Sequence, residues 1–171
     1  MNQSFLSSLK WGVIIGLANL TWLYAAFYLG LHTSGILIFQ VFMLIWLAIT
    51  VVGFIFALLS IRRKSEAWTY LRGLYLGSLV ALVSALFAVI AQIGYFTVIH
   101  PQWPEVMAGQ AKDHFKSQGL SDAELLQKVD EAKEFFTLTN YATQSAISAL
   151  ILGILLTAIL MIFLRRPINQ K

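Results

Sequence analysis

The sequence has no cysteine and contains long stretches without any charged residue. The absence of cysteine excludes disulfides, thiol catalysis, lipidation on cysteine and iron–sulfur ligation. Charged residues make up only 12% of the chain, against 58% hydrophobic residues, which lies outside the usual range of soluble domains. Asp, Glu, Lys and Arg are all absent from three stretches, residues 11–61, 73–104 and 135–164. Stretches of this length are typical of helices that cross a membrane.

The three uncharged stretches predict four membrane-spanning helices. A span needs about 20 apolar residues, so the first stretch holds two spans, separated by a turn at GLHTSG, residues 30–35. Each of the other stretches holds one span. The predicted spans cover residues 11–29, 36–60, 73–99 and 141–164. We therefore expect an all-α integral membrane protein in which residues 1–171 form a single membrane domain, a bundle of four transmembrane helices.

Basic and acidic residues are distributed unevenly between the segments that flank the predicted spans. The two termini and the 61–72 connection together carry eight basic residues and one acid, whereas residues 100–138 carry four lysines and seven acids. Basic residues close to span ends stay in the cytoplasm. The distribution therefore predicts a multi-pass membrane protein with cytoplasmic termini and an extracytoplasmic 100–138 insert. It does not indicate nucleic-acid binding, because the basic residues flank spans.

The 100–138 insert carries the signals of a helical hairpin. Pro104 suits the first turn of a helix that stops at Gly119. Ser121 and Glu124 match the S-x-x-E capping box of a second helix. An apolar stripe follows at helical spacing, made of Leu125, Val129, Ala132 and Phe136. We expect this stripe to dock on the bundle or on the membrane surface; the alternative is a solvated connector with incidental charges.

Three finer features of this region can be predicted. Trp103 suits the lipid headgroup layer, and Glu124 and Lys128 have the i, i+4 spacing of a helical ion pair. Thr139 or Asn140 offers a fresh N-cap for the last span. We therefore expect a bend between the second hairpin helix and the last span, not one continuous rod.

Several motifs are similar to those of a known family. They are IRRK at residues 61–64, WTYLRGLYLG at residues 68–77 and IHPQW at residues 99–103, together with the charged insert and the basic residues after the last span. With these motifs the chain resembles, over nearly its whole length, the bacterial four-span membrane family catalogued as domain of unknown function 4199. The resemblance implies a small inner-membrane protein. The family's name implies no activity, substrate or cofactor, so no functional residue is carried over.

Few residues of the predicted spans could carry chemistry. The spans contain no Asp, Glu, Lys, Arg or His, although such residues mark proton-coupled transport. The amides Asn19, Gln92 and Gln144 indicate hydrogen bonds between helices, with a small polar cavity as the alternative. His100 and His114 could form a metal site only by converging with Glu105, and no HExxH spacing supports it. No span holds a histidine to ligate haem, so we expect no catalytic, cofactor or metal site and no enzyme.

Small residues recur along the predicted spans at the spacing that lets helix backbones approach closely. The predicted helix-packing residues are Gly12, Gly16, Gly73, Gly77, Ala81, Ala85 and Gly153. Packing within the chain is their first expected use, and one stripe is available for another membrane protein or a second copy.

Two functions remain open from the sequence. The first is a non-catalytic accessory, assembly or scaffold subunit that acts through the insert, with Asp130, Glu131 and Glu134 as its partner surface. The second is a small oligomeric transporter or channel, with a path past Gln92 and Gln144. Both require the lipid bilayer, and neither requires a nucleic acid or a cofactor.

Overall fold

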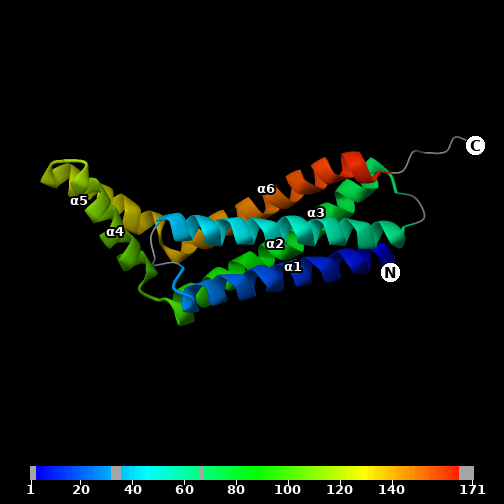
Figure 1. Ribbon diagram of the computed structural model, residues 1–171, viewed down its shortest axis with the longest axis horizontal. Helices are drawn as coiled ribbons and strands as arrows, with labels where there is room; N and C mark the ends of the chain where they lie inside the picture. The colour runs from blue at the N-terminus through cyan, green and yellow to red at the C-terminus, as the bar shows by residue number, and fades with distance from the viewer. Residues whose placement is uncertain (1–2, 32–35, 66–67, 166–171) are drawn as a thin grey trace, which may run out of the picture. The chain divides into compact units, whose positions relative to one another are not determined.

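The computed structural model describes residues 3–31, 36–65 and 68–165, and within these ranges all regular structure is helical. The helices are α1 (Gln3–Tyr28), α2 (Ile36–Arg63), α3 (Tyr70–Gly94), the π-helical turn η1 (Tyr95–Ile99), α4 (Trp103–Ser117), α5 (Asp122–Phe135) and α6 (Leu138–Leu164) (Figure 1).

Four segments are long and apolar enough to cross a membrane: Gln3–Tyr28, Gln40–Arg63, Tyr70–Ile99 and Leu138–Leu164. Between the third and fourth of them, α4 and α5 form a helical hairpin. The predicted all-α fold, with four candidate spans and a hairpin between the last two, is thereby confirmed. Such helices imply a lipid bilayer as their surroundings.

The chain divides into two compact units. Unit 1 comprises residues 1–88 and 146–171, and therefore contains α1, α2 and the larger parts of α3 and α6. Unit 2 comprises residues 89–145, which contain the end of α3, η1, the α4–α5 hairpin and the start of α6.

The helix α1 begins earlier than the predicted first span. Ser4, Ser7 and Ser8 are buried in its first turns. The Ser4 hydroxyl donates to the carbonyl of Lys64 over 3.2 Å, and the Ser8 hydroxyl donates back to the carbonyl of Ser4 over 3.1 Å. Since these small polar side chains face protein, the helix continues past the apolar run to Gln3. At its other end Gly30 adopts φ 72°, a conformation that favours glycine; residues 32–35 of the predicted turn lie outside the described residues.

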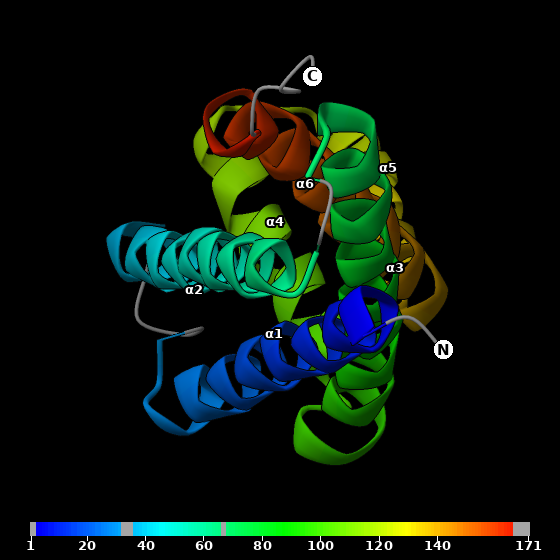
Figure 2. The ribbon, with the colours of Figure 1, turned by 90° about the vertical axis from the view of Figure 1, so that its right-hand side faces the viewer.

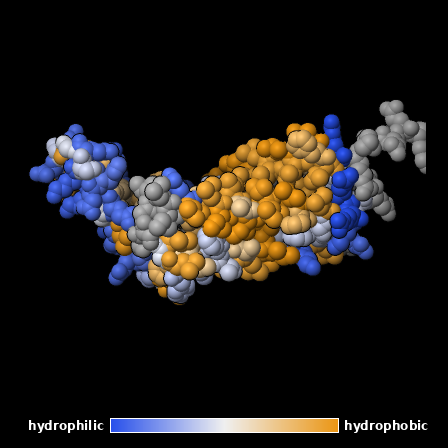
Figure 3. Space-filling model, viewed as in Figure 1, coloured by the Kyte–Doolittle hydropathy of each residue, from blue (hydrophilic) through white to orange (hydrophobic). Residues whose placement is uncertain are grey.

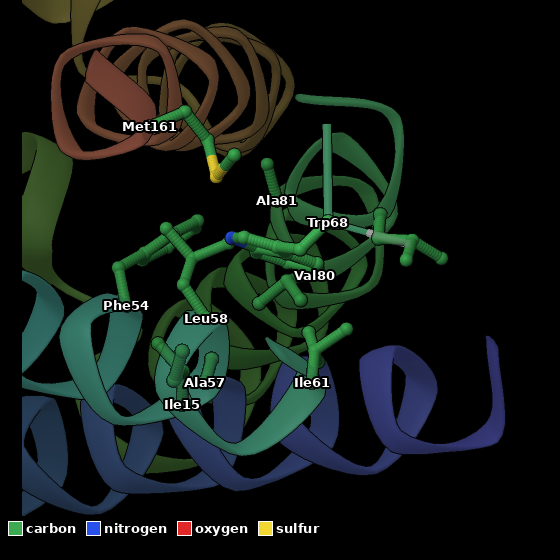
Figure 4. Packing of buried hydrophobic residues seen from close by; sticks show 10 residues of the cluster. Ile15, Phe54, Ala57, Leu58, Ile61, Trp68, Val80, Ala81 and Met161 are labelled. Carbon is green, nitrogen blue, oxygen red and sulfur yellow. The ribbon is translucent and has the colours of Figure 1, made fainter. Parts of the chain in front are cut away.

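Trp68 is the largest side chain in the core of unit 1. It precedes α3 and is 2% exposed, and its ring inserts between side chains of α2, α3 and α6 (Figure 4). The other core residues are Ile15 of α1, Phe54, Ala57, Leu58 and Ile61 of α2, Leu76, Val80 and Ala81 of α3, and Met161 of α6.

The outward faces of the long helices are also apolar. Large side chains such as Leu44, Leu71 and Phe163 are exposed by 65%, 75% and 78%, and hydrophobic atoms cover the visible face of the spans (Figure 3). A soluble protein rarely exposes apolar patches of this size. In a bilayer the same side chains contact lipid tails instead of water, so their exposure carries no hydrophobic penalty.

The small residues predicted to mediate packing lie against neighbouring helices in unit 1. A Cβ added at Gly12 would fall 2.6 Å from Val83 Cβ, and one at Gly153 would fall 2.6 Å from Ala81 Cβ. Added Cβ atoms would also collide at Gly16 with Phe87, at Gly73 with Met161 and at Gly77 with Thr157. Ala81 and Ala85 are themselves buried. These close approaches join α1 to α3 and α3 to α6, and Figure 2 views the helices from the end where α1 begins.

In unit 2 the apolar stripe of α5 turns inward within the hairpin. Leu125 is buried, and Val129, Ala132 and Phe136 are partly buried, whereas most of the remaining α5 side chains are exposed. The helix α4 packs against α5 and contributes the buried Ala108. Part of the expected docking is therefore provided by the partner helix of the hairpin.

The predicted capping box is present at the start of α5, whereas two other contacts predicted near its ends are wrong. The capping box forms, since Glu124 Oε2 accepts from the Ser121 backbone N–H over 3.1 Å and from its hydroxyl over 2.6 Å. The predicted Glu124–Lys128 ion pair is wrong: because Glu124 is held by the cap, Lys128 pairs with Glu131 at 2.7 Å.

The predicted break before the last span is observed, because α5 ends at Phe135 and α6 begins at Leu138. The N-cap role expected of Thr139 or Asn140 is wrong, since both lie inside α6. Asn140 Nδ2 instead donates to the carbonyl of Glu134 over 2.8 Å. The same carbonyl, at the end of α5, also accepts from the Thr137 backbone N–H over 3.2 Å and from the Thr137 hydroxyl over 2.9 Å.

Candidate functional site

The third candidate span ends in the π-helical turn η1. The His100 backbone N–H donates to the carbonyl of Tyr95 over 2.7 Å, a bond that encloses one more residue than an α-helical turn. Such a widened turn is rare, and it often occurs at functional sites. Here it brings Tyr95 and His100, five residues apart, onto the same side of the chain.

Tyr95, His100 and Trp103 pack their rings together. The ring centroid of Tyr95 lies 5.9 Å from that of His100 and 5.9 Å from that of Trp103. The centroids of His100 and Trp103 lie 5.4 Å apart. The Tyr95 hydroxyl lies 3.4 Å from His100 Nδ1. Tyr95 and Trp103 are only 2% and 4% exposed, so the indole of Trp103 is buried among protein rings.

A second group of rings connects this turn to both neighbouring helices of unit 2. Tyr141, in the first turn of α6, lies with its centroid 5.6 Å from Phe96 of η1 and 5.6 Å from Phe136 at the end of α5. One turn further along, Gln92 Nε2 donates to Ser145 Oγ over 3.1 Å, joining α3 to α6. We call these six rings, Tyr95, Phe96, His100, Trp103, Phe136 and Tyr141, the aromatic cluster.

The aromatic cluster fixes the base of the hairpin. Aromatic pairs contribute about 0.5–1.5 kcal/mol each beyond their buried area, and the five pairs described here join η1, α4, the end of α5 and the start of α6. The cluster holds buried rings and one imidazole, whose Nδ1 lies 3.4 Å from the Tyr95 hydroxyl. It joins the ends of two helices that continue as candidate spans to the two helices of the hairpin.

The histidines and carboxylates considered for a metal site do not converge. His100 belongs to the aromatic cluster, while His114 lies in α4 with Nε2 3.0 Å from Gln118 Nε2. Across residues 3–31, 36–65 and 68–165, no three His, Asp or Glu side chains are close enough to hold a metal ion together. The cluster of His100, Glu105 and His114 that an enzyme would need is therefore not formed.

The three acids of the predicted partner surface, Asp130, Glu131 and Glu134, are all exposed on α5. At 100° per residue they lie opposite the stripe that begins with Leu125. Glu131 accepts from Lys128 Nζ over 2.7 Å and from Gln127 Nε2 over 3.0 Å. These hydrogen bonds, that of Lys128 first, hold the pKa of the Glu131 carboxyl below its ordinary value. The Glu131 carboxyl therefore stays ionised at neutral pH.

Two of the three amides considered for interhelical bonds make such bonds. Asn19 Nδ2 donates to Thr50 Oγ1 over 3.1 Å, joining α1 to α2, and Gln92 donates to Ser145 as described above. Gln144 is exposed on α6. Of the two amides that the predicted polar path would pass, Gln92 is thus engaged in a packing contact and Gln144 is not.

Two groups of residues were not identified from the sequence. The aromatic cluster has a signal, since six aromatic or imidazole residues gather around the two span boundaries that flank the insert. The buried serines Ser4, Ser7 and Ser8 repeat at i, i+3 and i+4, the spacing of one helix face. They were overlooked because they precede the apolar run.

Comparison with protein families identifies one match. Residues 10–166 match the family described as "Protein of unknown function (DUF4199)". Since the match covers most of the chain, the protein belongs to this family, as the resemblance of its motifs predicted. A comparison with curated proteins finds no match, and neither does a comparison with solved structures.

Proposed function

We propose that this chain is a non-catalytic accessory, assembly or scaffold subunit of the bacterial inner membrane, and that it acts by presenting the α4–α5 hairpin to a protein partner. The observation that carries the proposal is the difference between the two faces of α5. Its apolar stripe is buried or partly buried, while Asp130, Glu131 and Glu134 remain exposed on the opposite face. A helix that merely connected two spans would need neither a capping box nor a packed partner helix.

The anchoring of the hairpin supports the same proposal. A flexible linker would hold a partner loosely, whereas buried rings restrict the orientations of the segments that they join. Tyr141 contacts both Phe96 and Phe136, and Trp103, the first residue of α4, packs on Tyr95. The hairpin thus starts and finishes in one aromatic cluster, which suits a binding surface of fixed geometry.

The charge distribution supports an extracytoplasmic position for the hairpin. All seven acids of residues 100–138 lie in unit 2 together with four lysines, while the other segments carry eight basic residues against one acid. Lysines and arginines near span ends are retained in the cytoplasm. We infer cytoplasmic termini and a hairpin that faces the other side of the inner membrane.

The partner surface is tested by charge reversal. The tagged chain, cross-linked in its native membrane and purified in mild detergent, should retain a defined set of proteins. The triple variant Asp130→Lys, Glu131→Lys and Glu134→Lys should lose that set, while Asp113→Lys on α4 retains it. Limited proteolysis of both variants checks that the hairpin is still folded. An unchanged set in the triple variant would rule out this surface.

The transporter or channel alternative needs a polar path through the spans. The hydrogen bonds of Asn19 with Thr50 and of Gln92 with Ser145 favour packing instead. Solute or ion flux into liposomes that contain the purified chain, reduced by Gln92→Leu, would support the alternative against our proposal.

A further inference from the structure

The basic residues of unit 1 gather at one end of it. Lys10 lies near the start of α1, Arg62 and Arg63 close α2, Arg72 lies in the first turn of α3, and Arg165 follows α6. The Ser4–Lys64 hydrogen bond joins the start of α1 to the end of α2. The approach of Gly73 to Met161 likewise joins the start of α3 to the end of α6.

Figure 3 shows hydrophilic side chains on this end of the spans, next to the hydrophobic band. We call it the basic end, defined by Lys10, Arg62, Arg63, Lys64, Arg72 and Arg165. It directly adjoins the part of the surface that contacts lipid tails.

The basic end has no internal counter-charge among the residues that the structure describes. Every described Asp and Glu belongs to unit 2, and the sequence of unit 1 contains a single acid, Glu66, against eight basic residues. The six residues of the basic end form no ion pair within the described ranges. Among the described residues no acid compensates their mutual repulsion, and an external anion would relieve it.

The same end also contains three buried side-chain donors without a partner among the described residues: Ser7 Oγ, Arg62 Nε and Trp68 Nε1. A buried donor without an acceptor is destabilising. Ser7 and Trp68 are only 3% and 2% exposed, so an external acceptor does not reach them. The Arg62 side chain is partly exposed, so its guanidinium group is the one of the three that an external acceptor can approach.

We propose that the basic end binds the phosphate groups of anionic phospholipids and that this binding stabilises the spans. A phosphodiester carries the missing charge and several acceptor oxygens, and arginine guanidinium groups bind it with paired hydrogen bonds. A bilayer delivers phosphates at the depth where apolar spans give way to basic residues. Because the apolar outer faces adjoin the basic end, a lipid fits both surfaces, whereas free phosphate fits only one. The proposal is independent of the partner of the hairpin.

The test compares two sets of four charges. The full chain is reconstituted in phosphatidylcholine nanodiscs with increasing fractions of phosphatidylglycerol, and the midpoint of thermal unfolding is measured at low and high salt. One variant replaces four residues of the basic end by glutamine, Lys10, Arg62, Arg72 and Arg165. The matched control replaces the four hairpin lysines by glutamine, Lys112, Lys116, Lys128 and Lys133. Phosphatidylglycerol retained by each protein is counted by native mass spectrometry.

We expect phosphatidylglycerol to raise the unfolding midpoint of the wild type and of the hairpin control, but not that of the basic-end variant. High salt should reduce the rise, since exposed charges are screened. Apparent affinity for phosphatidylglycerol should fall about fivefold for each cation removed. If the fourfold variant does not fold, the single variant Arg62→Gln should still show this fivefold loss.

Three results would overturn the proposal. The first is a rise of the unfolding midpoint with phosphatidylglycerol that is as large in the basic-end variant as in the wild type; Arg62→Gln takes the place of this variant if the fourfold variant does not fold. The second is a loss of that rise in the hairpin control that is as large as the loss in the basic-end variant. The third is a full rise on adding inorganic phosphate to pure phosphatidylcholine nanodiscs, which would assign the site to a free anion. Loss of partner capture by the hairpin variants would bear on the proposed function alone.

Discussion

Replacing Gly77 by alanine tests a close approach of α3 to α6 in unit 1. An added Cβ would collide with the Cγ2 and Oγ1 atoms of Thr157 and would lie 3.0 Å from its Cβ. Thr157 cannot easily rotate away, because its hydroxyl donates to the carbonyl of Gly153 over 2.7 Å and its β-branched side chain has few rotamers. It is also fully buried. The two helices must therefore separate.

The expected change in the free energy of unfolding follows from two opposing effects. Overpacking a well-filled interior costs about 1–3 kcal/mol, while replacing glycine by alanine within a helix gains about 0.5–1 kcal/mol. The net loss for Gly77→Ala should be about 0.5–2 kcal/mol. Gly77→Leu should cost about 3 kcal/mol or more, since it adds three further carbons to the same collision.

Two matched glycines make the comparison specific. At Gly109 in α4, an added Cβ meets nothing within 4 Å, so Gly109→Ala should be neutral or slightly stabilising. At Gly73 the opposing atoms include the flexible end of Met161, which can move aside, so Gly73→Ala should cost less than Gly77→Ala.

Thermal unfolding of the purified variants in detergent measures their order of stability. A second substitution, Thr157→Ala, should recover part of the loss in Gly77→Ala, because it removes the two colliding atoms. Equal stability of Gly77→Leu and the wild type would refute the reasoning, since the 77 position would then face lipid. Absence of recovery in the double variant would place the collision elsewhere than at Thr157.

Three further predictions concern the hairpin. Leu125→Ser should make α5 sensitive to proteases while Leu126→Ser does not, since the two side chains are 8% and 67% exposed; equal sensitivity would argue against a buried stripe. Hydrogen bonds from Ser121 lower the pKa of Glu124, so the capping contribution is present above the ordinary glutamate pKa and is lost as pH falls through the lowered one. Hydrogen exchange of α5 should show this loss, and Ser121→Ala should reduce it, because that variant removes the hydroxyl but keeps the backbone hydrogen bond to Glu124. Alkaline phosphatase fused after Gly119 should be active, whereas a fusion at the C-terminus should be inactive; the reverse would invert the proposed orientation.

The number and order of the helices could be predicted because they depend on properties of single segments. The absence of charge over a length sufficient to cross a bilayer is visible in the sequence, and so are the S-x-x-E box and the glycine that ends α4. The Gly119 φ of 75° illustrates this: a left-handed residue at a helix end favours glycine. The break before α6 was predicted as well, although the residues it was predicted from, Thr139 and Asn140, lie inside α6 and do not cap it.

Contacts that depend on competition between partners could not be predicted. Lys128 is spaced to pair with Glu124, and it pairs with Glu131 because the cap has already used the Glu124 carboxylate. Asn140 is a good N-cap residue, yet it serves the preceding helix. In each case the residue type was interpreted correctly, and its partner was decided by three-dimensional proximity.

The aromatic cluster was missed for a different reason. Aromatic residues at a span boundary are expected in the headgroup layer, and Trp103 matches that pattern by position alone. The π-helical turn changes the direction of the chain after Tyr95, so that His100 and Trp103 fold back onto it. A turn one residue wider than an α-helical turn leaves no reliable sequence signal, although its consequence is a buried tryptophan.

The separation of charge along the chain makes the two proposals independent of each other. Acids concentrate in unit 2 and cations in unit 1, so either set can be altered without touching the other. Reversal of Asp130, Glu131 and Glu134 should change partner capture while the response to phosphatidylglycerol stays at its wild-type value. Neutralisation of Arg62 should do the opposite. If either change altered both responses, a single electrostatic surface would have to serve lipid and partner together, and neither the hairpin nor the basic end could be assigned a separate role.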